Sequence, residues 1–190
     1  MAKEKILDKE KAILETAISV FAERGFWNTP TSLISKTAGI ADGTLFTYFK
    51  TKDDLISQIY LEIKREVRDA VMEGFVDYGT TKEKIRHIWD RFIDWALQNP
   101  ERFDVIRQIG TSYPLSGAVM AQAMEPFAEI GVLAQESIAK GEIQDYPVAY
   151  LGALMDSQSS MTVLYIRANP NSDVDYKRIG FEILWNGVRR

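Results

Sequence analysis

Four residues within the stretch 39–52 have side chains suited to reading hydrogen bonds on another molecule. Gly43, Thr44, Thr47 and Tyr48 fall on one side of an expected helix and present small groups and hydroxyls where a solvent-facing helix usually carries charges. Such a face can approach the edges of DNA bases in the major groove, where donors and acceptors identify the sequence. The chemistry expected here is recognition of DNA.

Residues suited to catalysis or metal binding form no comparable pattern. His87 is the single histidine, it has no second metal ligand at helical spacing, and the chain has no cysteine. The sequence also lacks a glycine-rich phosphate loop, a nucleophile elbow and paired carboxylates in an apolar setting. We therefore expect no enzymatic activity, no metal site and no cofactor.

Composition and charge are typical of a soluble protein. The 190 residues are 46% hydrophobic and 26% charged, and no apolar run approaches the ~20 residues that span a bilayer. Together with the absence of cysteine and of a secretory leader, this predicts a cytoplasmic protein without membrane contact. The net charge is −4, yet residues 1–52 carry eight basic and six acidic side chains, which favours DNA contact through this part of the chain.

Apolar residues recur at helical spacing along the whole chain, so we predict an all-α fold. The helix that carries the four residues spans only about 42–49, and a helix this short is marginal in water unless neighbours hold it. Leu45 and Phe49 point away from the hydroxyls and should pack against the two preceding helices. The sequence therefore predicts a small three-helix unit at this end of the chain.

Start and stop residues set the expected helix boundaries. Thr29 and Thr51 should cap the second and fourth helices, and Gly25 and Gly79 should end the first and fourth. Pro126 should kink the longest of the later helices. The expected helices span about 8–24, 29–38, 42–49, 51–78, 81–98, 101–109, 115–140, 147–168 and 175–188.

A series of motifs in the N-terminal third follows a known pattern without an insertion. They are Ala17, Phe21-Ala22-Glu23-Arg24-Gly25-Phe26, Thr29 through Ile34, Ala38-Gly39-Ile40, Gly43-Thr44-Leu45, Tyr48-Phe49, Lys52 and Leu55. The stretch from Ile13 to Leu55 resembles the TetR (tetracycline-repressor-like) family of bacterial transcription regulators. The resemblance implies a helix-turn-helix DNA-binding domain over residues 7–67, with the helix-turn-helix at about 30–49. Residues 68–190 would form a larger ligand-sensing and dimerisation domain.

The resemblance also implies specific contacts with DNA. Hydroxyl and backbone N–H groups at the start of the second helix would bind phosphates, the third helix would read bases, and the fourth would begin with a phosphate contact. The residues at these positions are Thr29, Thr31, Gly43, Thr44, Thr47, Tyr48 and Lys52.

Two residues depart from the family pattern. Phe46 stands where the family usually has a tyrosine whose hydroxyl reaches a phosphate, so one backbone contact should be lost. Asp42 occupies a position that is often basic or neutral, and its carboxylate would repel DNA unless it is tied to the backbone as a helix cap. Together they predict modest affinity or an unusual operator.

Aromatic and polar residues of the later helices could line an apolar ligand cavity, although the same spacing is typical of ordinary helix cores. The candidates are Trp89, Phe92, Trp95, Phe103, Arg107, Tyr113, Gln122, Phe127 and Gln158.

The predicted function is a ligand-responsive regulator, a repressor that a small apolar or amphipathic molecule releases from its operator. Its partners would be a palindromic double-stranded DNA operator, a small-molecule effector and a second copy of the chain. Dimerisation is expected through the helices at 147–168 and 175–188, which carry more apolar surface than a monomer needs. The alternative is a helical small-molecule-binding or interaction protein that has lost DNA binding. Asp42, Phe46 and the sequence pI of about 5.2 favour this alternative.

Overall fold

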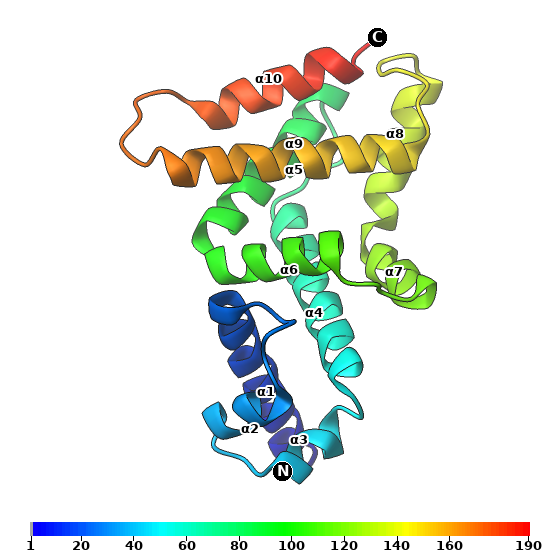
Figure 1. Ribbon diagram of the computed structural model, residues 1–190. Helices are drawn as coiled ribbons and strands as arrows, with labels where there is room; N and C mark the ends of the chain where they lie inside the picture. Colours follow the sequence, from blue (N-terminus) through cyan, green and yellow to red (C-terminus); the bar gives the residue numbers. More distant parts are fainter. Residues whose placement is uncertain (1) are drawn as a thin grey trace. The chain divides into compact units, whose positions relative to one another are not determined.

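The computed structural model describes the backbone of residues 2–190 and the side chains of residues 9–190. Within these residues the fold is all-α, as predicted (Figure 1). No helix in this part of the chain is both long enough and apolar enough to cross a membrane. The elements are α1 (Ala2–Arg24), α2 (Thr31–Thr37), α3 (Asp42–Tyr48), α4 (Lys52–Met72), α5 (Thr81–Gln98), α6 (Pro100–Ser112), α7 (Gly117–Met124), the 3-10 turn η1 (Glu125–Phe127), α8 (Ala128–Ala139), α9 (Val148–Ala168) and α10 (Tyr176–Val188).

The helices belong to two compact units. The first contains the chain up to Arg65 together with Asn99–Ala123, and the second contains Glu66–Gln98 and Met124–Arg190. Residues 68–190 were expected to form one domain, whereas α6 and most of α7 belong to the first unit.

The core of the first unit forms around α1. Its apolar stripe is buried and α2 packs against it, while α3 packs on α2. Gly25 ends α1 and Gly39 makes the turn between α2 and α3, and both adopt the left-handed conformation that glycine tolerates, with φ of 71° and 67°. The residues of the α1 stripe are Ile13, Leu14, Ala17, Ile18 and Phe21.

The α6 helix completes the first unit although it lies far along the sequence. It packs against α1, and Phe103 and Ile109 of α6 are buried. The guanidinium Nη2 of Arg102 donates to both carboxylate oxygens of Glu15, each at 2.6 Å. An arginine that bonds both oxygens of one carboxylate fixes orientation as well as distance.

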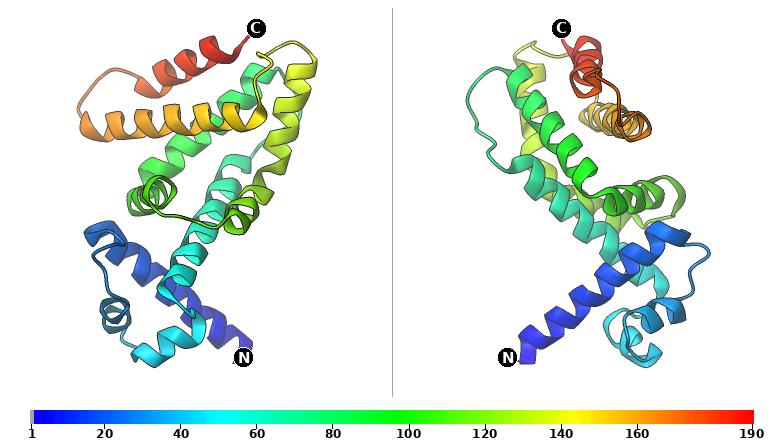
Figure 2. Two further views of the ribbon diagram at one scale, coloured as in Figure 1. Left: turned by 45° about the vertical axis from the view of Figure 1, so that its right-hand side comes forward. Right: turned by 90° about the vertical axis from the view of Figure 1, so that its left-hand side faces the viewer.

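The second unit is organised by α9 and α10, which lie side by side and run in opposite directions (Figures 1 and 2). Trp89 of α5 is fully buried, and its indole N–H donates to the Lys177 carbonyl of α10 at 2.9 Å. A β-bridge between Ile143 and Arg189 holds the chain before α9 against the end of α10. Gly180 of α10 lies closely against Thr162 and Trp89.

Several predicted helix boundaries were wrong, and each error has a local cause. The α4 helix ends at Met72 rather than near Tyr78, because Gly74 turns the chain with φ of 71° before Gly79 is reached. Pro126 breaks the helix instead of kinking it, since it sits in a 3-10 turn between α7 and α8. Thr29 does not cap α2, because α2 begins at Thr31 and Pro30 occupies the N-cap position without a side-chain cap.

Replacing Gly180 with alanine should destabilise the second unit. The added Cβ would lie 2.5 Å from Thr162 Oγ1 and 2.8 Å from Trp89 Cζ2, so the buried tryptophan would have to move. Overpacking of this kind costs about 1–3 kcal/mol. Denaturant unfolding should show this loss for Gly180→Ala, whereas Gly131→Ala in α8, where nothing lies within 4 Å, should retain or gain stability. Equal stability of the two variants would contradict the close packing.

Candidate nucleic-acid interface

The α3 helix is held from one side only. Leu45 and Phe49 are 0% and 1% exposed, and they fix the helix to the first unit. Gly43 and Thr47 are exposed, and Thr44 and Tyr48 are half-buried at the edge of the same face. The structure therefore gives α3 the orientation predicted from the sequence, with its small and hydroxyl-bearing residues facing outward.

Gly43 is not required by the fold. Its φ is not positive, and a Cβ built at this position would meet nothing within 4 Å. A helical glycine costs stability relative to alanine, so no reason for this glycine lies within the described residues. Its usefulness would come from the close approach of another molecule.

The exposed hydroxyl of Thr47 is able to accept a hydrogen bond from another molecule. Thr47 Oγ1 donates to the Gly43 carbonyl at 2.9 Å, which occupies its proton and leaves its lone pairs facing outward. A hydroxyl in this state can accept from a base amino group. It can also donate if it releases the carbonyl.

Asp42 and Phe46, the two departures from the family pattern, both lie in the outward face of α3. The N-cap of α3 is Ala41 and no side chain caps the helix, so the Asp42 carboxylate is not tied to backbone N–H groups. The Phe46 ring is 41% exposed and offers no hydroxyl. One charge and one apolar ring thus stand within the outward face.

Thr29 and Thr31 differ in their suitability for phosphate contact. Thr29 is fully buried and its hydroxyl donates to the Gly25 carbonyl at 2.7 Å, so the predicted hydroxyl contact does not fit this position. Thr31 is half-buried at the first position of α2. There its hydroxyl and the free N–H groups of the first helical turn can meet a phosphate.

The start of α4 is capped by Thr51, as predicted. Thr51 Oγ1 accepts from the Asp54 N–H at 3.0 Å, and the Asp54 carboxylate accepts from the Lys50 N–H at 2.9 Å. This reciprocal arrangement resembles a capping box. It fixes the turn between α3 and α4.

Lys52, the predicted phosphate contact, already has a partner. Its Nζ donates to the Phe26 carbonyl in the loop after α1, and burial lowers the pKa of its ammonium group while Asp53 opposes that shift. Contact between Lys52 and a phosphate would require this hydrogen bond to be exchanged. No sequence pattern indicates this hydrogen bond, because the partner is a backbone atom 26 residues away.

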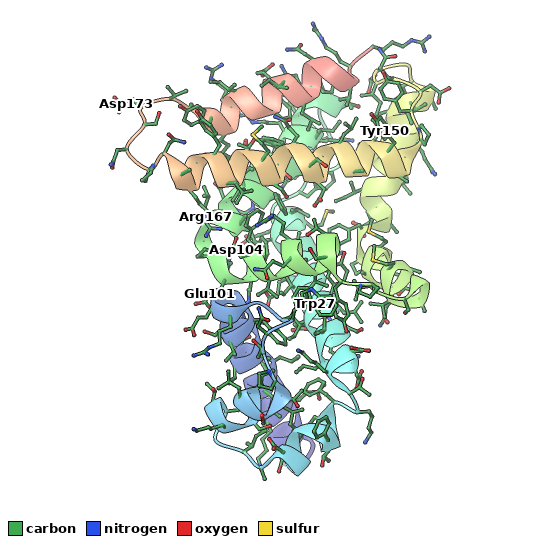
Figure 3. All side chains as sticks on the ribbon, viewed as in Figure 1. Trp27, Glu101, Asp104, Tyr150, Arg167 and Asp173 are labelled. Atoms are coloured by element: carbon green, nitrogen blue, oxygen red, sulfur yellow. The ribbon has the colours of Figure 1, made fainter. Side chains whose placement is uncertain are left out.

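An aromatic cluster that the sequence analysis missed lies beside Lys52. Phe26, Trp27 and Tyr113 bring their ring centroids within 5.1–5.5 Å of one another, and Trp27 remains largely exposed (Figure 3). The Tyr113 hydroxyl donates to the Asp53 carboxylate. Burial, and then this hydrogen bond, raise the pKa of Tyr113 to about 12, so it remains a donor at neutral pH. The residue after α6 is thereby tied to the first turn of α4.

The predicted ligand residues divide between the two units. Phe103, Arg107, Tyr113 and Gln122 belong to the first unit, and Trp89, Phe92, Trp95, Phe127 and Gln158 belong to the second. Trp89 and Phe103 have fully buried rings and belong to the cores of their units. Gln122 is exposed. Buried side-chain nitrogens without a hydrogen-bond partner occur at Arg107 and Gln158.

Comparison with known proteins finds bacterial regulators among the similar proteins. Residues 13–59 match the model of the bacterial regulatory proteins of the tetR family. The chain is 35% identical over 77 residues to a fatty acid metabolism regulator protein of Bacillus subtilis, an alignment that spans 40% of each protein. A putative tetR family transcription regulator from Shewanella sp. PV-4 superposes with a TM-score of 0.88 at 29% identity, covering 96% of this chain and 98% of that one.

A third relative was solved with a bound ligand. This transcriptional regulator from Bacillus subtilis, in complex with stearoyl-CoA, superposes with a TM-score of 0.74 at 23% identity, over 93% of this chain and 98% of that one. The short exposed α3 beside α2 defines a helix-turn-helix protein. Taken with the matches, it makes the chain similar to the bacterial regulatory proteins of the tetR family, through residues 13–59 in particular.

Replacing Gly43 with alanine should separate stability from DNA recognition. The helix should gain about 0.5 kcal/mol because alanine is the better helix former, while affinity for a duplex selected by the unmodified protein should fall. Gly110→Ala is the matched control, because Gly110 also lies in a helix of the first unit with nothing within 4 Å. Chemical unfolding and fluorescence anisotropy measure the two effects. Unchanged DNA affinity in Gly43→Ala would show that this position does not face DNA.

Proposed function

We propose that the protein is a ligand-responsive, DNA-binding transcriptional regulator that acts as a repressor. The observation that carries the proposal is the outward face of α3, with Gly43 and Thr47 exposed above the buried Leu45 and Phe49. The curated relatives support it, although their alignments span only about 40% of their own length. In this proposal α3 enters the major groove, and the start of α2 and Lys52 contact phosphates.

The proposed active form is a homodimer that recognises a palindromic operator. The last two helices carry several exposed apolar side chains, more than isolated surface residues would explain. Two such helices from each copy can form a four-helix bundle with two-fold symmetry. The two α3 helices would then meet major-groove faces about 34–36 Å apart. The exposed residues are Tyr150, Met161, Leu164, Tyr165 and Ile183.

The proposed effector is a small apolar or amphipathic molecule. The relatives described above include a fatty acid metabolism regulator and a protein solved with stearoyl-CoA, which supports a ligand with a long apolar part. Such a ligand releases DNA only if it binds the DNA-free arrangement more tightly than the DNA-bound one. The effector and the operator would then weaken each other's binding by the same factor.

A second candidate function is a ligand-binding protein that has lost DNA binding. The untied carboxylate of Asp42, the exposed Phe46 ring and the hydrogen bond of Lys52 favour it. A mobility shift on the promoter DNA of its own or a neighbouring gene discriminates the two. Binding that weakens steeply with salt supports the regulator, and no shift at low salt supports the alternative.

Two substitutions should affect DNA binding in different ways. Thr47→Ala should change which sequences are preferred, because it removes a base-facing hydroxyl. Lys52→Ala should weaken all sequences about equally and reduce the salt slope by about 1, as expected for one lost phosphate contact. Lys140→Ala in the second unit is the control. If Lys52→Ala leaves the salt slope unchanged, Lys52 stays with Phe26 and does not contact DNA.

Introducing a charge on α10 should prevent dimerisation. Ile183 is 56% exposed, and Ile183→Asp would place an unpaired carboxylate in the proposed apolar interface. Light scattering at micromolar concentration should report a dimer for the unmodified protein and a monomer for this variant. Val76→Asp, which changes an exposed valine in the loop after α4, should remain dimeric. A monomeric unmodified protein would contradict the proposal.

A further inference from the structure

Arg107 of α6 carries a buried guanidinium nitrogen that has no partner. Its Nε is shielded from solvent and makes no hydrogen bond, and no ion pair to the Arg107 guanidinium occurs in the part of the chain that the structure describes. An arginine side chain does not lose its proton in proteins. The folded chain therefore holds a partly desolvated cation without a counterion.

The other partly buried arginines are satisfied. Arg86 pairs with Asp90 at 2.8 Å, Arg102 pairs with Glu15, and Arg91 pairs with Glu73. Burying a charge is costly unless the charge is paired and hydrogen-bonded. Arg107 departs from this pattern, so its partner is expected to come from outside the chain.

We propose that Arg107 binds the anionic head group of an amphipathic effector. The inference rests on the proposed ligand-responsive function and specifies its ligand. A guanidinium presents donors in a planar fork that suits a carboxylate or a phosphate.

The first unit also contains an apolar helix that follows α6 in the chain. The α7 helix belongs mainly to the same unit, contains no charged residue and exposes Met120. Methionine side chains are flexible and adapt to apolar chains of different shape. An effector with an anionic group and a long alkyl chain matches both features.

The location of Arg107 also explains how binding could reach the DNA-reading helices. Within the first unit, α6 is fixed to α1 by Arg102 and Glu15, and Tyr113 after α6 is hydrogen-bonded to Asp53 at the start of α4. An anion at Arg107 therefore acts on a helix that is directly tied to the recognition unit. It needs no separate relay within this unit.

The ligand class can be tested on the full chain without DNA. Isothermal titration calorimetry would compare dodecanoate, dodecyl phosphate and the neutral methyl dodecanoate. We expect at least one anion to bind and the ester to bind about tenfold or more weakly, since it cannot pair with the guanidinium. Equal binding of anion and ester by the unmodified protein, or no binding of either anion, would overturn the inference.

Variants assign the effect to Arg107. Arg107→Met should lose about tenfold or more in affinity for the bound anion, whereas Arg178→Gln, which changes an exposed arginine of α10, should bind as the unmodified protein does. Unaltered anion binding in Arg107→Met would overturn the assignment.

Thermal unfolding gives a readout that a purely structural role would move in the opposite direction. The ligand-free Arg107→Met variant should have a raised Tm, because it lacks an unpaired and partly desolvated charge, and the anion should no longer stabilise it. A lowered Tm together with retained stabilisation by the anion would overturn the inference. Because no measurement involves DNA, failure here remains distinguishable from failure of the proposed regulatory function.

Discussion

A helix of seven residues cannot stand alone, and the rest of the first unit follows from that constraint. Isolated helices shorter than about 12 residues are marginal in water, so α3 depends on the burial of Leu45 and Phe49. The Thr51 cap fixes where the next helix begins. Because support comes entirely from one face, the opposite face is free of packing demands. That face can therefore carry a glycine and hydroxyl groups that the packing of the unit does not require.

The α6 helix of the same unit combines side chains that have partners with one that has none. Arg102 and Tyr113 tie α6 and its end to α1 and α4, while Arg107 lies between them with an unpaired guanidinium. Paired and unpaired side chains therefore occur on the same helix. The Arg102 ion pair and the Tyr113 hydrogen bond hold the two ends of α6, while the unpaired guanidinium of Arg107 between them keeps a local free-energy cost.

Local patterns predicted the local structure well, and contacts distant in sequence were beyond them. Amphipathic spacing placed Leu45 and Phe49 inside, and Gly25 ended α1 as expected. The predicted end of α4 at Gly79 was too late, because the chain already turns at Gly74 in the left-handed conformation. Hydrophobic periodicity does not show which of two glycines ends a helix. The hydrogen bond of Lys52 to the Phe26 carbonyl joins positions 26 residues apart. No rule of residue spacing predicts such a pairing. The packing of α6 in the first unit could not be predicted either, because it also joins residues far apart in the sequence.

The packing of α6 on α1 limits how this protein can be divided or recombined. A fragment that stopped at Arg65 would lack Asn99–Ala123, leaving Glu15 without its arginine and the Phe26 ring without Tyr113. A chimera that exchanged only the N-terminal helices with those of a relative would break the same contacts. The portable module is discontinuous in sequence, so an engineered exchange of the outward residues of α3 should leave the surrounding helices in place.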